Sequence, residues 1–469
     1  MTLLASPGKS AALRARRWDI VVLGSALPGL VAAAYLAKRG LRVLVIEEEA
    51  AARLFPGFHE PFLLLGGEGS VLNLCFQELM LPLIERRALE RDATAFQLVL
   101  PEARINFGEP TLTSSELAGW GLCTADAAEE LVRALARAGA AERAAMLDAP
   151  VVRSGRLRTL ARGGAPRAAR RERGLPVEIT SPPPSLEPLF AAQLRALSHL
   201  GDAPMPPEGF ARLVGGPLES PALSPTTGCF VHELLRRRIK ALHGEFRAVS
   251  RRFQLIEVNS QPGIAVEKAT EVWVGRALII NAPKRALADF LRGADGADSP
   301  LLQVSEPTHR CVALHYRIRC DLIPEGMERR VICVRDLHKA MTGDNVITLQ
   351  QFPPAEGSRS CDWIARTVVE HTQSAEQAAE TAVAAVLRDL LPFSADKLSR
   401  VHSAAPVWDD ATLLSDPKPG GGWPCDTDIR LASRPPVFHL AREDVAALGS
   451  EGELLLGWRA GEVIGAQLG

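Results

Sequence analysis

The stretch from Asp19 to Glu47 places the strongest constraint on how this chain can fold. Its first five residues, 19–23, form a short apolar run, typical of a strand that is buried on both faces. A glycine-containing turn follows, then Ala and Leu at helical spacing up to Gly40, and a second apolar run, 42–46, that ends in Glu47. Strand, turn, helix, strand and acid within about thirty residues predict a dinucleotide-binding βαβ unit.

Each position of the turn has a physical role. Gly24 permits the tight turn, Gly29 lets the helix pack on the strand, and the helix N-terminus directs N–H groups and its positive dipole at a pyrophosphate. Glu47 would accept hydrogen bonds from ribose hydroxyls and repel a 2′-phosphate, which disfavours NADP. The expected nucleotide contacts are Gly24, Ser25, Ala26, Leu27, Pro28, Gly29, Glu47 and Glu48.

Ala26 departs from the usual glycine pattern of such turns. Its Cβ lies where the pyrophosphate would approach the backbone. The sequence therefore also allows a Rossmann-type unit that has kept its shape and lost its ligand.

These residues resemble the opening of FAD-dependent flavoproteins of the phytoene desaturase and flavin amine oxidase superfamily. The resemblance continues in Pro225-Thr-Thr-Gly228, in an amphipathic run over 231–247, in alternating strands, and in the apolar segment Ala277–Pro283. In that superfamily the βαβ unit binds the ADP half of FAD. The resemblance implies a backbone contact to adenine near Arg252 and places Asn281 and Ala282 near the flavin.

A third block of resemblance lies near the C-terminus. Residues 386–392 are similar to the last helix of the substrate domain, Glu453–Gly457 to the final buried strand, and 461–466 to the turn that opens the closing helix. The N–H groups of that helix would face the pyrimidine end of the flavin. The implied contacts in this block are Gly457, Trp458, Val463 and Ile464.

Two further positions depart from the superfamily pattern. The usual Arg-x-Gly-Gly flavin turn is reduced to Arg53 and Gly57, and Trp458 and Arg459 stand where an acid normally binds the ribityl chain. Together with Ala26, these departures motivate the hypothesis of a subunit that keeps the FAD fold without catalysis or relays electrons within a complex.

The resemblance implies an α/β fold with two domains. A discontinuous Rossmann-like FAD-binding domain would use 18–100, 222–292 and 400–469, and an α+β substrate or cap domain would use 101–221 and 293–399. Proline- and glycine-rich segments fit these edges, for example 181–188 and 416–424. Residues 1–17 are expected to form a flexible basic tail.

Composition excludes several function classes for the 469-residue chain. A formal net charge of −1 argues against a protein that coats nucleic acid. We find no apolar stretch long enough to span a membrane and no secretion signal. The eight cysteines contain no CxxC pair and no metal-ligand spacing, so we expect reduced thiols, no metal and a cytoplasmic location.

One segment hides a strong local charge. Residues 153–173 contain eight arginines and one acid, Glu172. This density favours an anionic contact, such as an acidic protein partner, an acyl-CoA or phosphate, or peripheral contact with an anionic membrane. The alternative is a solvated loop.

The sequence assigns no catalytic residue. Its histidines, among them His59, His232 and His315, form no recognisable triad. Because a flavin performs the redox step itself, a flavoenzyme does not need a catalytic triad or dyad. The only two tyrosines, Tyr35 and Tyr316, cannot build a tyrosine cage for an amine, although a tryptophan or a phenylalanine could serve in such a cage. We therefore favour a small-molecule substrate that is apolar or bears a carboxylate over a free amine.

Three hypotheses follow from the sequence. The first is an FAD-dependent oxidoreductase of the desaturase or dehydrogenase type, with hydride transfer from the substrate to flavin N5. The second is the non-catalytic or electron-relaying subunit. The third is an NAD-linked dehydrogenase built on the same βαβ unit.

Overall fold

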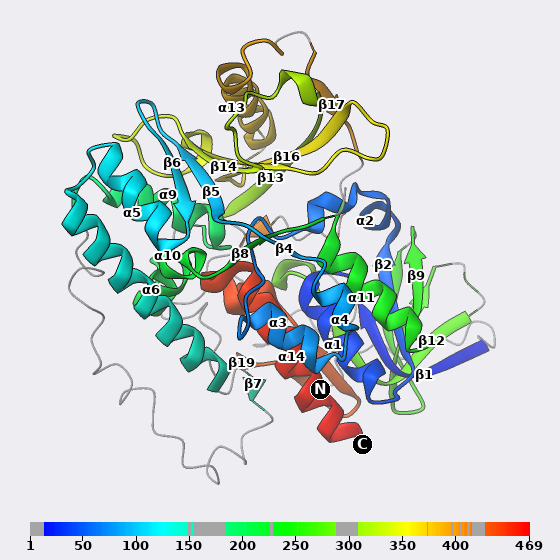
Figure 1. Ribbon diagram of the computed structural model, residues 1–469. Helices are drawn as coiled ribbons and strands as arrows, with labels where there is room; N and C mark the ends of the chain where they lie inside the picture. Colours follow the sequence, from blue (N-terminus) through cyan, green and yellow to red (C-terminus); the bar gives the residue numbers. More distant parts are fainter. Residues whose placement is uncertain are drawn as a thin grey trace.

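The computed structural model describes most of the chain. The described residues are 14–148, 152–153, 183–201, 203–225, 228–250, 252–267, 269, 271–287, 308–372, 374–394, 397–403, 406, 408–409, 413–414 and 427–469. Two sheets with their helices form two units, the lower one in Figure 1 around β1, β2 and α1 and the upper one around β13, β16 and α13. The arginine-rich segment 153–173 lies outside the described residues apart from Arg153, whose backbone ends a short strand.

The first sheet has a parallel centre. Apolar runs buried on both faces form β1 and β2, and these strands are joined through α1 as the sequence predicts. The hydrogen-bonded order is β10-β11-β12-β1-β2-β9, with β21 parallel to the end of β12 and β20 antiparallel to β21. The bounds are β1 (Arg14–Leu23), β2 (Val43–Glu48), β9 (Glu245–Val249), β10 (Phe253–Val258), β11 (Gln261–Val266), β12 (Glu271–Ile280), β20 (Arg430–Ser433) and β21 (Pro436–His439).

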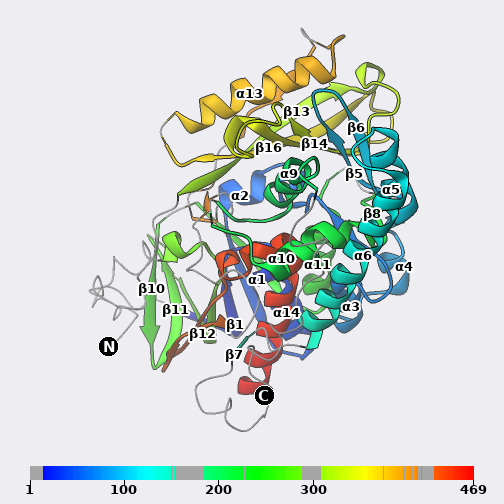
Figure 2. The same cartoon turned by 90° about the vertical axis from the view of Figure 1, so that its left-hand side faces the viewer.

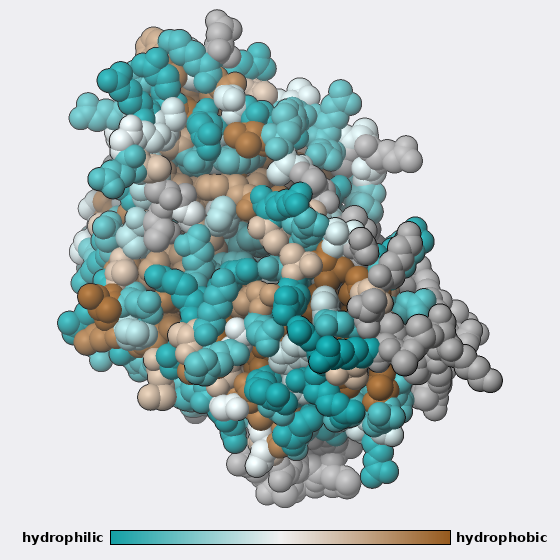
Figure 3. Space-filling model, turned by 90° about the vertical axis from the view of Figure 1, so that its right-hand side faces the viewer, coloured by the Kyte–Doolittle hydropathy of each residue, from teal (hydrophilic) through white to brown (hydrophobic). Residues whose placement is uncertain are grey.

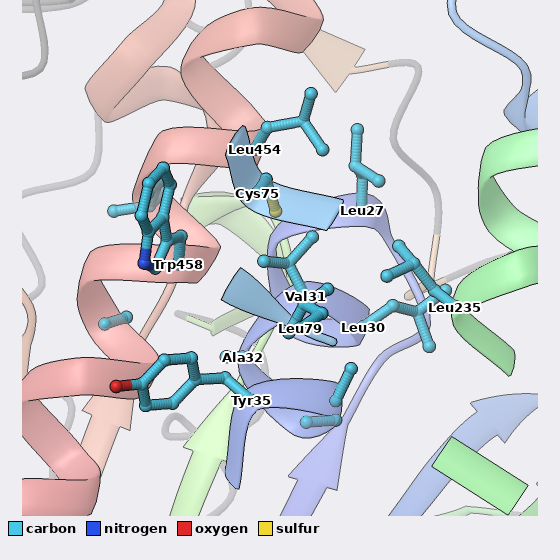
Figure 4. Packing of buried hydrophobic residues seen from close by; sticks show 14 of the residues in the cluster. Leu27, Leu30, Val31, Ala32, Tyr35, Cys75, Leu79, Leu235, Leu454 and Trp458 are labelled. Carbon is cyan, nitrogen blue, oxygen red and sulfur yellow. The ribbon is translucent and has the colours of Figure 1, made fainter. Parts of the chain in front are cut away.

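Three helices pack closely around the start of this sheet. Helix α1 (Leu27–Lys38) is buried over nearly its whole length, because α11 (Phe230–Ala241), α14 (Gly449–Leu468) and the sheet surround it. Figure 4 shows Leu30, Val31 and Tyr35 of α1 among side chains of α3 (Val71–Glu78), α11 and α14. This packing fixes the N-terminal end of α1, where a nucleotide would bind.

The second sheet carries the upper unit. Its order is β17-β13-β16-β15-β14-β5-β6, with β18 paired to β13. Helix α13 (Ala375–Leu390) covers one face, and α9 (Glu187–Leu197) contacts β14 and β15, as Figure 2 shows. The bounds are β5 (Thr94–Val99), β6 (Arg104–Gly108), β13 (His309–Arg319), β14 (Arg330–Val334), β15 (Val346–Gln351), β16 (Ser360–Glu370), β17 (Ser399–Val401) and β18 (Leu413–Leu414).

The remaining elements connect and flank the two sheets. Long helices α5 and α6 lie beside the second sheet (Figure 1), and α10 packs on α6 and α9. The bounds are α2 (Glu49–Arg53), η1 (Pro56–His59), β3 (Leu64–Leu65), α4 (Leu83–Arg86), β4 (Glu90–Arg91), α5 (Pro110–Gly119), α6 (Ala125–Asp148), β7 (Val152–Arg153), α10 (Pro207–Gly215), η2 (Gly216–Leu218), β8 (Pro221–Leu223), η4 (Cys320–Leu322), η5 (Gly343–Asn345), β19 (Thr427–Asp428) and η6 (Arg442–Leu448).

Several boundaries differ from the expectations drawn from the sequence. Strand β1 begins at Arg14, inside the expected tail 1–17, because β12 extends to Glu271 and pairs with these four extra residues. Strand β5, expected in the FAD-binding domain, pairs with β14 of the second sheet. The expected final strand Glu453–Gly457 is wrong, since these residues lie inside α14 and the last strand of the first sheet is β21.

The length and the apolar character of the helices decide whether one of them could cross a membrane. Within the described residues, no helix combines the length and the apolar character needed to cross a bilayer. On the face drawn in Figure 3, apolar residues stand in small groups among hydrophilic ones, with no broad apolar area among the residues coloured there.

Candidate functional site

A cavity of about 440 Å³ lies between the two sheets. One end is the turn before α1, represented by Ala26 and Leu27. The other end is the second sheet, whose strands β13, β15 and β16 contribute residues such as Leu314, Thr348 and Arg366. A concave site where two sheets meet is the expected place for a small ligand.

Close backbone packing shapes the turn end of the cavity. Gly24 has a φ of +100°, and a Cβ there would lie 2.0 Å from the carbonyl oxygen of Asn281. A Cβ on Gly29 would lie 2.3 Å from Nδ2 of the same residue. Asn281 fastens the turn, because its Nδ2 donates to the Ala26 carbonyl oxygen at 2.8 Å and its backbone N–H donates to Leu23. Both glycines are thus required for the fold itself, with or without a nucleotide.

The Asp409 carboxylate lies at the N-terminal end of α1. Both of its oxygens are 3.2 Å from the Ser25 backbone nitrogen, and the Ser25 hydroxyl donates to Oδ2 at 3.0 Å. Burial raises the pKa of Asp409 to about 7, with a further upward contribution from Glu47 and Glu48, while the hydrogen bonds from Ser25 oppose the rise. An acidic side chain of the chain itself therefore occupies the position that the sequence assigns to a pyrophosphate.

The predicted ribose acid is also engaged within the protein. Glu47 is buried at the end of β2 and accepts two hydrogen bonds from Arg236 of α11, at 2.5 and 2.9 Å. The Arg236 guanidinium carbon lies 4.2 Å from the centre of the Phe246 ring. This bidentate pair holds the carboxylate that would otherwise face the ribose.

Arg366 dominates the opposite end of the cavity. It lies on β16 between Ala313 of β13 and Thr348 of β15, on the sheet face turned away from α13. Its guanidinium donates to Gln350 Oε1 at 2.7 Å and to the carbonyl oxygens of Gly57, Phe58 and Glu60 at 3.1 to 3.4 Å. All four acceptors are neutral, so among the described residues no carboxylate bonds directly to Arg366. Burial lowers the pKa of Arg366, while the nearby Glu60 carboxyl acts on it at longer range and raises its pKa, and a guanidinium stays charged at neutral pH.

A buried charged cluster lies where α14 begins. His199 Nε2 is 3.0 Å from Glu453 Oε1, and Arg442 Nε is 3.2 Å from the same oxygen. Burial alone would raise the pKa of Glu453, but Arg442 and His199 outweigh it and the pKa is lowered. Burial and the charge of Arg442 lower the pKa of His199. This cluster is charge-balanced within itself when His199 is neutral.

A second buried carboxyl borders the cavity. Glu60 accepts hydrogen bonds from Cys229 Sγ at 3.0 Å and from the backbone nitrogen of Val231 at 3.3 Å, at the start of α11. Burial raises the pKa of Glu60 to about 7, and these hydrogen bonds oppose the rise. Nearby, the rings of His59 and His232 stack with centres 4.6 Å apart, and burial lowers the pKa of both.

Several residues expected at the site lie elsewhere. Arg53 is a surface residue that pairs with Glu49 one helical turn earlier. The Arg252 carbonyl oxygen is used by Glu267 in the hairpin of β10 and β11, and Ala248 is the residue that pairs with Glu47. Ala282 is buried beside His439, which contacts its carbonyl oxygen.

The residues of α14 that the resemblance assigns to the cofactor lie outside the cavity, and Gly457 lies in the contact of α14 with α1. A Cβ on Gly457 would lie 2.4 Å from the Pro28 carbonyl oxygen, so this glycine lets α14 approach α1. Trp458, Val463 and Ile464 lie on the same helix and do not line the cavity. The part of α14 that does reach the cavity is its first turns, with Ser450, Glu451, Glu453 and Leu454.

The turn has the donor chemistry that a dinucleotide pyrophosphate needs. The Ser25 N–H and hydroxyl, at the positive end of α1, already bind the carboxyl group of Asp409. Residues 24–29 would hold the pyrophosphate of FAD, and Glu47 would reach the ribose once Arg236 moved away. Within the described residues, no cluster of His, Cys, Asp and Glu is arranged to bind a metal ion.

The residues that distinguish this site were missed from the sequence. Asp409 stands 384 positions from Ser25, and Arg236 stands 189 positions from Glu47. The only available signal was negative, namely the altered turn at Ala26. Arg366 could have been noticed as a charged residue within an otherwise apolar strand run.

Comparison with solved structures identifies the fold. The chain is similar to an oxidoreductase from Methanosarcina mazei with 14% identity and a TM-score of 0.56, covering 94% of this chain and 98% of that one. It is similar to a putrescine oxidase bound to putrescine, with 12% identity, a TM-score of 0.56 and coverage of 96% and 100%. Cyclohexylamine oxidase from Brevibacterium oxydans gives 14% identity, a TM-score of 0.52 and coverage of 96% and 99%.

At these identities the likeness establishes the fold and nothing finer. No family model matches the sequence, and no curated protein matches it significantly. The chain thus shares the fold of these solved structures, in agreement with the fold that the sequence resemblance predicts. Function has to be argued from the cavity and its residues.

Proposed function

We propose that the protein is an FAD-dependent oxidoreductase of the desaturase or dehydrogenase type that acts on an apolar substrate bearing a carboxylate. The observation that carries the proposal is the cavity itself. It connects the turn before α1 to the guanidinium of Arg366, whose hydrogen-bond acceptors are all neutral. A bound flavin would supply the hydride acceptor.

The residues of the cavity support this substrate class. Leu27, Leu54, Phe58, Phe62 and Leu454 offer an apolar body to the ligand. Arg366 would bind its carboxylate, because a guanidinium and a carboxylate form two parallel hydrogen bonds. Such a pair would fix the orientation of the substrate in the cavity, with its apolar part against the leucines.

The test uses the purified full-length chain reconstituted with FAD. We expect a visible flavin spectrum that is bleached under anaerobic conditions by a medium-chain carboxylic acid and not by the alcohol or amine of equal length. Bleaching by the amine alone would contradict the substrate class. A protein that never takes up flavin would contradict the proposed cofactor, and NADH binding by that protein would favour the NAD-linked alternative.

A second function is supported by the charges at the turn end. Asp409 and Arg236 fill the pyrophosphate and ribose positions in this conformation. A subunit that keeps the FAD fold and works in a complex without catalysis would show the same features. Such a protein would be colourless after incubation with FAD and would copurify with partners.

A further inference from the structure

Asp409 is held in the turn from two directions. Its carboxylate accepts hydrogen bonds from the Ser25 N–H and hydroxyl, as described above. Behind it, Glu48 Oε2 accepts the backbone N–H groups of Trp408 at 2.8 Å and of Asp409 at 3.1 Å. Trp408 also packs edge-on against Phe253, with ring centres 5.2 Å apart. We call Trp408 and Asp409 the clamp.

The clamp uses the donors that a phosphate would need. A carboxylate and a phosphate oxygen both accept from N–H groups at a helix N-terminus, and both favour its positive dipole. Above about pH 7, where the Asp409 carboxyl is ionised, it cannot share the Ser25 donors with a phosphate within 3.2 Å, because like charges repel strongly where burial excludes water. Only 8% of Asp409 is exposed, so water does not screen this repulsion well.

We propose that Asp409 is a built-in competitor for the pyrophosphate of a dinucleotide, so that the clamp must leave the turn before FAD can bind. The inference rests on the proposed function for the identity of the nucleotide. The competition explains why the turn has the hydrogen-bond donors of a nucleotide site although Asp409 occupies them. It also makes loading with cofactor dependent on the state of the chain around residue 409.

The binding of ADP tests the competition separately from flavin chemistry. ADP carries the pyrophosphate and ribose shared by FAD and NAD, and it needs no flavin pocket. We expect Asp409→Ala to bind ADP about tenfold more tightly than the unaltered chain in isothermal titration, because the competing anion is gone. Asp409→Asn, which keeps the shape and removes the charge, is expected to bind ADP more tightly by a smaller factor.

The matched control is Asp344→Asn. Asp344 is an exposed acid of η5 in the upper unit, paired with Arg335. The control should bind ADP like the unaltered chain, whereas equal tightening in Asp344→Asn would show a general charge effect and overturn the proposal. Thermal unfolding of each variant confirms that it is folded.

The outcomes separate the competition from the proposed function. Tighter ADP binding by both Asp409 variants supports the competition even if no variant retains flavin, a result that would contradict the FAD-dependent activity alone. Equal ADP affinity of the Asp409 variants and the unaltered chain overturns the competition. If these proteins nevertheless take up FAD, the proposed function is not affected. Failure of every variant to bind ADP or FAD contradicts both.

Discussion

The two ends of the cavity differ in how their buried charged side chains are paired. At the turn end, Glu47 is paired with Arg236 and Asp409 is held by Ser25, so the chain satisfies its own nucleotide-binding groups. At the sheet end, Arg366 has only neutral acceptors. An end that is filled from within must open before a ligand enters, whereas a cation bonded only to neutral acceptors can still pair with the carboxylate of a ligand.

The comparison also separates what is fixed from what can move. The turn and its glycines are locked by Asn281 and by the packing of α14 on α1. Asp409 and Arg236 are side chains that reach in from other segments. The backbone of the turn is therefore fixed, and Asp409 and Arg236 are the residues that would have to move for a nucleotide to bind there.

The largest expected effect is a loss of stability when Gly24, in the turn before α1, is substituted. Gly24→Ala places a Cβ 2.0 Å from the Asn281 carbonyl oxygen at a φ of +100°, so the free energy of unfolding should fall by about 4 kcal/mol. Gly40→Ala is the matched control, because Gly40 has a φ of +82° and nothing within 4 Å of a Cβ, and it should cost about 1 kcal/mol. Urea unfolding of both variants measures the difference, and equal losses would refute the close approach.

The next effect concerns the sheet end. Arg366→Met should weaken binding of a medium-chain carboxylate about a hundredfold, roughly 2.7 kcal/mol, and leave the affinity for the matching alcohol within about threefold. Isothermal titration with the two ligands measures this. Arg317→Met, which removes an exposed arginine of β13 paired with Asp362, is the control and should change neither affinity. Equal losses for acid and alcohol in Arg366→Met would indicate a packing role.

The pH dependence of stability tests the two buried carboxyls that border the cavity. Asp409 and Glu60 both have a pKa of about 7 in the folded chain, well above the value for an unfolded chain. At these two groups the folded state therefore binds more protons between about pH 4 and 7, so their contribution to the free energy of unfolding decreases as the pH rises through this range. Each group should contribute a loss of about 2 kcal/mol between pH 5 and 8.

Single variants assign this pH dependence to its two sources. Asp409→Asn and Glu60→Gln should each flatten part of the fall in stability, measured by urea unfolding at several pH values. A pH profile identical to that of the unaltered chain in both variants would show that neither carboxyl has a raised pKa.

The smallest effect is expected at Ala26. Ala26→Gly removes the Cβ beside the expected path of the pyrophosphate and should tighten FAD binding by about threefold, or roughly 0.7 kcal/mol. Fluorescence titration with FAD measures the change. Weaker binding would show that this Cβ does not obstruct the nucleotide.

The sequence predicts the βαβ unit well because its signals are local. The apolar runs of β1 and β2 and the glycines of the turn act within about thirty residues, and the structure forms these elements. The alternating strands after α11 are likewise present as β10, β11 and β12.

The C-terminal block was misinterpreted because a short apolar run does not distinguish a strand from a buried helix. Glu453–Gly457 belongs to α14, whose glycines at 457, 461 and 465 recur every fourth residue and face α1. That spacing was the signal for a helix in close contact with another. The clamp had no comparable signal, because the contact of Asp409 with Ser25 is set by the whole fold.

The most direct test of the account is flavin retention by the full-length chain and by Asp409→Ala. Each protein is incubated with excess FAD, freed of unbound FAD by gel filtration, and examined by visible absorption. We predict that Asp409→Ala retains clearly more flavin than the unaltered chain. Equal retention would contradict the competition at the turn, and absence of flavin from both would contradict the assignment of FAD.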